Sequence, residues 1–201
     1  MSDCGCHPEA STSAERRILR IALALNAMMF VIGFVAGLIA QSMGLIADSL
    51  DMLADASAYA IGLIAVARSI QFKASAGRAS GAILLLLGLG VVGGVAWRFW
   101  VGSDPQGLLI IGIAFIALTV NTIVLRLLER FRHAEIHLRA TWLFTRVDVI
   151  ANLAVIISGV LVLALKSAAP DLIIGAALGL YIIREAVGIL REAHEQKTKC
   201  A

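Results

Sequence analysis

Charged residues are scarce in this sequence. Only 15% of its 201 residues are Asp, Glu, Lys or Arg, whereas 60% are hydrophobic and the mean hydropathy is +0.90. A soluble domain carries about 25% charged residues, so there is too little polar surface here to cover a water-soluble globule. The composition therefore excludes a soluble globular domain and indicates a membrane protein.

Cysteine is also scarce. The chain has three cysteines, Cys4, Cys6 and Cys200, all in polar segments. Their odd number, and the short spacing of Cys4 and Cys6, argue against a disulfide framework, and free thiols suit the reducing cytosol. The polar first residues also lack the apolar core of a signal peptide.

Apolar segments are long enough to span a bilayer at six places. A spanning helix needs about 20 mainly apolar residues. We expect spans at 18–40, 43–67, 79–100, 108–128, 143–165 and 172–190. The sequence therefore predicts an all-α membrane protein with six transmembrane helices.

Lysine and arginine are unevenly distributed between these spans. They are abundant before the first span, between the second and third, between the fourth and fifth, and after the sixth, but sparse in the other connections. Positive charge marks the cytoplasmic side of a membrane, so we expect both termini in the cytoplasm. Because membrane topology accounts for the positions of the basic residues, we expect no nucleic-acid partner. The predicted organisation is a cytoplasmic tail at 1–17, a six-helix transmembrane domain at 18–190 and a short cytoplasmic tail at 191–201.

Three aspartates interrupt the second span. Asp48, Asp51 and Asp55 lie at positions i, i+3 and i+7, within about 60° of one face of a helix. Each carboxylate costs about 2.5–3.5 kcal/mol in the membrane interior, and mutual repulsion adds to that cost. Protonation or a divalent cation would offset it. The pattern predicts an ion site, although Asp48 is close enough to the span's start to be a capping acid.

The fifth span carries Asp148 and, one turn later on the same face, Asn152. Asn152 is suited either to donate a carbonyl oxygen to a hard cation or to form an interhelical hydrogen bond, and the sequence does not separate these roles. Arg146 points about 200° away from Asp148, which suits a side chain that reaches for the cytoplasmic surface.

The segments LIADSLDMLADA and RVDVIANLAVIISGVLV of these two spans resemble the second and fifth helices of cation diffusion facilitators, which transport divalent metal ions. The resemblance extends over all six spans and includes polar positions at Asn26 and Asn121. It implies a metal site formed by Asp51 and Asp55 from the second helix and Asp148 from the fifth.

The chain departs from this family at its fifth-helix histidine. The position four residues before Asp148 is Phe144, which cannot bind a metal, so another ligand must complete the shell. The candidates for this accessory ligand are Asp48, Asn152, Thr145, Asn26 and water.

Members of the family usually carry a cytoplasmic C-terminal domain that holds a dimer. We expect this chain to be a short member without that domain, which dimerises through its transmembrane helices. The third span is rich in glycine, which permits close helix approach, and packing within the chain explains these glycines at least as well as a dimer does. These glycines are Gly81, Gly88, Gly90, Gly93 and Gly94.

Two groups of metal-binding residue types lie outside the spans. Cys4, Cys6 and His7 form a Cys-x-Cys-His tract suited to capturing zinc or cadmium at the cytoplasmic mouth. His133 and His137 lie one helical turn apart and could bind metal or pass protons. The competing interpretation of the first group is a disordered tail whose cysteines have no role. That of the second is a pair of ordinary solvated histidines.

The resemblance implies a transporter, not an enzyme, that has no cofactor and exports divalent cations from the cytosol in exchange for protons. Zn²⁺ and Cd²⁺ are favoured, and Mn²⁺, Fe²⁺ or Co²⁺ are alternatives because an oxygen-rich site suits harder ions. Metal and protons compete for the same carboxylate oxygens, and alternating access requires the helices to move. A bacterial inner membrane is the expected location, with lipid as the surrounding partner.

Two other hypotheses compete with export. A non-transporting metal-binding subunit is consistent with the missing histidine at Phe144. An intramembrane aspartyl protease is disfavoured, because the sequence lacks the Gly-x-Gly-Asp setting that resemblance to such proteases requires.

Overall fold

The chain folds into a bundle of long α-helices. The computed structural model describes residues 13–65, 70–129 and 136–199, which contain six helices and no strand. The helices are α1 (Ser13–Ile39), α2 (Met43–Ala65), α3 (Ile70–Val101), α4 (Gly107–Glu129), α5 (Ile136–Leu165) and α6 (Ala169–Lys199). The predicted all-α fold with six helices is confirmed.

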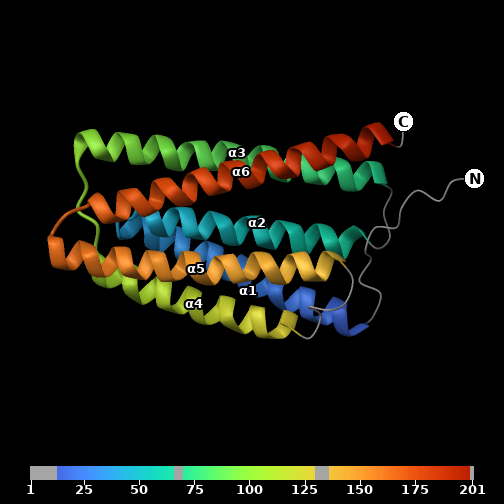
Figure 1. The fold of residues 1–201 in the computed structure, drawn as a ribbon, viewed down its shortest axis with the longest axis horizontal. Helices are drawn as coiled ribbons and strands as arrows, with labels where there is room; N and C mark the ends of the chain where they lie inside the picture. Colours follow the sequence, from blue (N-terminus) through green and yellow to red (C-terminus); the bar gives the residue numbers. More distant parts are fainter. Residues whose placement is uncertain (1–12, 66–69, 130–135, 200–201) are drawn as a thin grey trace, which may run out of the picture.

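Successive helices run up and down the bundle. In Figure 1, α1 begins and α6 ends at the same end of the molecule, and α1 meets α2, α3 meets α4 and α5 meets α6 at the other end. Every second helix therefore runs in the same direction, and α2 and α6 are parallel to one another.

Five of the helices are long and apolar enough to cross a membrane. These segments are Arg16–Ile39, Ser75–Val101, Gly107–Glu129, Val147–Leu165 and Ala169–His194. α2 is of similar length but carries Asp48, Asp51 and Asp55. It contacts all five other helices, so the polar helix lies at the centre of the bundle and the apolar helices surround it.

Several helices extend beyond the predicted spans at one end. α3 begins at Ile70 rather than near residue 79, and α6 continues to Lys199. The residues predicted to form a short C-terminal tail from 191 are thus mostly helical. Ala, Glu, Gln and Lys, which dominate this stretch, are good helix formers in water, so the helix does not stop where the apolar segment ends.

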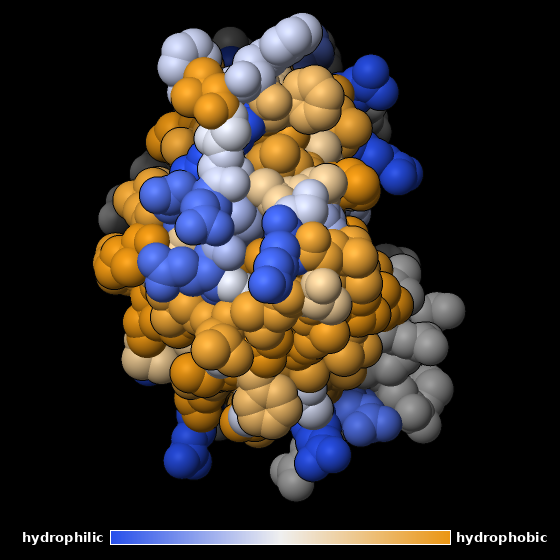
Figure 2. Space-filling view, turned by 90° about the vertical axis from the view of Figure 1, so that its left-hand side faces the viewer, coloured by the Kyte–Doolittle hydropathy of each residue, from blue (hydrophilic) through white to orange (hydrophobic). Residues whose placement is uncertain are grey.

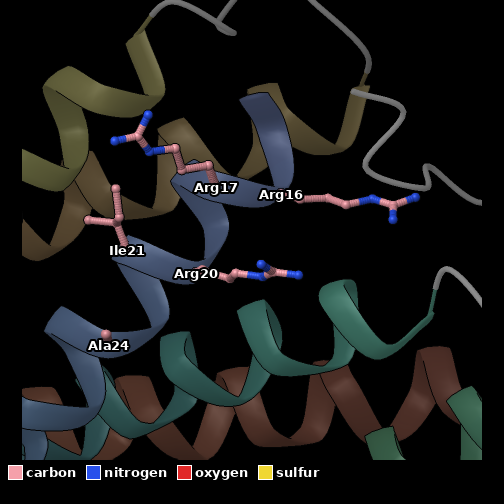
Figure 3. Close-up of a pocket in the computed structure, with 5 residues that line it drawn as sticks. All are labelled: Arg16, Arg17, Arg20, Ile21 and Ala24. Carbon is pink, nitrogen blue, oxygen red and sulfur yellow. The ribbon is translucent and has the colours of Figure 1, made fainter. Parts of the chain in front are cut away.

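The two ends of the bundle differ in charge. Figure 2 looks onto the end at which α1 meets α2, where a group of hydrophilic residues lies beside the centre of a mainly hydrophobic face and others lie toward its upper and lower edges. At the opposite end, Arg16, Arg17 and Arg20 line a pocket on α1 with Ile21 and Ala24. Arg16 and Arg20 extend to one side of the helix and Arg17 to the other (Figure 3). Positive charge is therefore concentrated at the end that the sequence predicts to face the cytoplasm.

Candidate ion site within the helix bundle

A chain of side-chain hydrogen bonds joins three helices in the interior. Nδ2 of Asn121 on α4 donates to Oδ1 of Asn152 on α5 at 3.0 Å, and Nδ2 of Asn152 donates to Oδ1 of Asp48 on α2 at 2.5 Å. All three residues are buried. Asn152 therefore makes an interhelical hydrogen bond, which was one of its two predicted roles, and Asp48 has a donor of its own.

Asp148 lies one turn before Asn152 and faces the other two aspartates of α2. Because α5 runs antiparallel to α2, four residues back along α5 correspond to about 6 Å toward later residues of α2. This displacement brings Asp148 level with the stretch between Asp51 and Asp55. Asp148 is close enough to interact electrostatically with both of them. The structure thus brings together the three aspartates predicted as metal ligands.

One oxygen of the Asp148 carboxyl group lacks a hydrogen-bond donor. The residue is 6% exposed, and its Oδ2 atom is buried without a hydrogen-bond partner. Its neighbours are the carboxyl groups of Asp51 and Asp55, which have no proton to donate when ionised. Carboxyl groups in such contact are stable when they share a proton or hold a cation between them. The cluster is therefore suited to bind either protons or a metal ion.

The carboxyl groups of this cluster are not arranged closely enough to coordinate a metal ion as they stand. Among the described residues, no three His, Cys, Asp or Glu side chains stand in metal-binding geometry. The hydroxyl of Tyr59 is 3.4 Å from Oδ2 of Asp55, which is long for an O–H···O bond. A metal ion would therefore have to draw the carboxylates into a tighter arrangement.

α6 adds two residues that the sequence analysis missed. Tyr181 and Glu185 lie one turn apart on this helix and are both partly buried. Glu185 acts electrostatically on Asp51 and Asp55, and Tyr181 lies near enough to interact with all three aspartates of the cluster. The rule that acids inside a membrane span are functional applies to Glu185 and would have identified it.

A fifth aspartate has a different environment at the end of the bundle. Asp171 of α6 is fully buried, and its oxygens accept hydrogen bonds from Oγ of Ser42 at 2.5 Å, N of Met43 at 2.7 Å and N of Gly44 at 3.2 Å. It therefore caps the first turn of α2, whose N–H groups have no partner within their own helix. Every contact here is with a donor, so Asp171 joins two helices and needs no ion.

Of the remaining predicted ligands, Asn26 makes a hydrogen bond within its own helix, and the others lie outside the described residues. Nδ2 of Asn26 donates to the carbonyl oxygen of Ala22 in its own helix at 3.0 Å. The residues whose side chains lie outside the described part are Cys4, Cys6, His7, His133, His137, Phe144, Thr145 and Arg146. Their predicted roles stay predictions.

The family model described as the cation efflux transmembrane domain matches residues 19–196. The matched range covers most of the 201-residue chain and includes Asp51, Asp55, Asp148 and Glu185. A search of curated proteins finds no significant match.

Proposed function

The chain belongs to the cation efflux family, and from this premise we propose that it exchanges cytosolic divalent metal ions for protons at Asp51, Asp55 and Asp148. As a family member with five strongly apolar helices, it is an integral, multi-pass membrane transporter of cations. The direction of transport, the coupling ion and the metal specificity are the proposed parts.

The observation that carries the proposal is the buried Oδ2 atom of Asp148, which has no hydrogen-bond donor and faces two further carboxyl groups. Such a cluster is unstable as three free anions in a membrane. It can be neutralised by protons or by a divalent cation, and because both use the same oxygens, they exclude one another. Proton binding from one side and metal binding from the other then drive exchange.

We propose zinc and cadmium as the preferred substrates, with manganese, iron(II) and cobalt as alternatives. Family resemblance favours zinc and cadmium, and the Cys4, Cys6 and His7 tract offers ligands of the kind that these ions prefer. The oxygen-rich cluster favours the harder alternatives. The proposed location is a bacterial inner membrane.

We also propose a homodimer that forms through the transmembrane helices. The surroundings of the α3 glycines indicate which part of α3 is available for its interface. A Cβ atom at Gly81 or Gly88 would meet side chains of α6, and one at Gly94 would meet Met43. Gly90 and Gly93 face open space, so they are the α3 glycines free to contact a second copy.

Zinc uptake into inside-out membrane vesicles with an imposed pH gradient tests the proposal. We expect gradient-driven uptake by the wild type and almost none by Asp51→Asn. The matched control is Asp104→Asn, which makes the same chemical change at an exposed residue outside the helices and should transport normally. Zinc binding without uptake by the wild type would instead favour the non-transporting metal-binding subunit, once manganese and iron(II) had also been tried.

A further inference from the structure

α6 is held against α2 in a defined longitudinal register. Asp171 accepts hydrogen bonds from the first residues of α2. One turn later, Gly175 packs directly on Met43, where an added Cβ would lie 2.7 Å from Cβ of Met43. These contacts place residue 175 of α6 beside residue 43 of α2.

This register sets the depth of Glu185. Because α2 and α6 run in the same direction, the step from 175 to 185 on α6 corresponds to a step from 43 to 53 on α2, about 15 Å along the bundle. Glu185 is therefore level with the middle of the Asp51–Asp55 stretch. The same reasoning from the Asn152–Asp48 hydrogen bond places Asp148 near residue 52.

Glu185 is also within electrostatic range of Asp51 and Asp55. It is partly buried, whereas the adjacent Arg184 is exposed, and Tyr181, one turn earlier, lies near all three aspartates. Three helices thus present carboxylates at one level of the bundle: two from α2, one from α5 and one from α6. The donor-free Oδ2 atom of Asp148 is an independent sign that a proton or a cation binds at this level.

We propose that Glu185 is a fourth carboxylate ligand of the ion site and takes the place of the histidine that the fifth helix lacks at Phe144. This inference rests on the proposed function, since it concerns the same site. An oxygen-only set of four carboxylates reduces the advantage of zinc and cadmium over manganese, because imidazole favours the former and carboxylate the latter. Glu185 is therefore a determinant of metal specificity.

Binding of Zn²⁺ and Mn²⁺ to the purified full-length protein, measured by titration calorimetry, tests the role of Glu185. Glu185→Gln should weaken binding of both ions at least tenfold, whereas Glu185→Asp, which keeps the carboxylate, should stay within a few fold of the wild type. Glu185→His should shift the ratio of zinc to manganese affinity at least tenfold toward zinc. A merely structural glutamate would not produce this shift.

The control is Glu192→Gln, an exposed acid on the same helix, which should bind both ions like the wild type. Wild-type affinities and an unchanged zinc-to-manganese ratio in Glu185→Gln would overturn the proposal. If Glu185→Gln does not fold, the ratio in Glu185→His decides in its place. An unchanged ratio there also overturns the proposal.

Transport by the same proteins in liposomes separates this inference from the proposed function. A wild type that binds metal through Glu185 but moves none would contradict the transport function and leave the ligand assignment standing. A wild type that transports, with Glu185→Gln unchanged in binding and flux, would contradict only the ligand assignment. A wild type that binds neither ion would overturn both.

Discussion

Two buried aspartates in this molecule, Asp171 and Asp148, have opposite surroundings. Asp171, where α6 meets α2, is surrounded by hydrogen-bond donors from Ser42, Met43 and Gly44. Asp148, in the interior, has an oxygen without a donor and lies beside other carboxyl groups. Burial alone therefore does not identify a functional acid. The neighbouring groups do identify one. A carboxylate surrounded by hydrogen-bond donors has a structural role, whereas a carboxylate beside other acids needs a cation or a proton to be stable.

The largest effect is expected at Asp148. Asp148→Asn should reduce metal transport at least a hundredfold, because it removes a charged ligand, yet the protein should unfold at the same or a higher temperature since repulsion with Asp51 and Asp55 is relieved. Vesicle uptake and thermal unfolding in detergent measure the two effects. A strong loss of stability would show that the cluster is structural, as Asp171 is.

Asp171→Asn should give the reverse result. The amide keeps one acceptor but loses the charge that caps α2, so the free energy of unfolding should fall by about 1–3 kcal/mol. Metal affinity and transport per folded molecule should stay at the wild-type level. Chemical unfolding and calorimetric titration check this, and a large change in affinity would contradict a purely structural role.

Asp48 is intermediate between these two cases, since it is buried near the cluster but has the donor Asn152. We expect Asp48→Asn to lower transport by less than tenfold, well short of the effect at Asp148. Initial uptake rates at saturating metal measure the difference. A loss equal to that of Asp148→Asn would make Asp48 a direct ligand.

The smallest effect is expected at Gly90, which faces open space on α3. Gly90→Ala should change the free energy of unfolding by no more than about 0.5 kcal/mol and leave transport unchanged. The bulkier Gly90→Leu should weaken the proposed homodimer, as measured by cross-linking in membranes. A dimer unaffected by Gly90→Leu would exclude this face of α3 as its interface.

The sequence was sufficient to predict the six helices, whereas the grouping of Asp148 with Asp51 and Asp55 was implied by the family resemblance and not by a local pattern. Helical periodicity puts Asp51 and Asp55 on one face, and the apolar segments set the approximate helix positions. The pairing of Asp171 with Met43 joins residues 128 positions apart, and no local pattern encodes it. Glu185 was visible as an acid inside a span, but its depth relative to the cluster depends on that same long-range contact.

The Asp171 junction has a mechanical consequence. It fixes one end of α2 to one end of α6, so a relative motion of these two helices is a rotation about that point, and displacement grows with distance from it. A rotation of about 5° would shift positions about 12 Å away, as at Asp51, by about 1 Å and those about 18 Å away, as at Asp55, by about 1.6 Å. The two acids of α2 would then differ in how far they move relative to α6, with the larger displacement at Asp55.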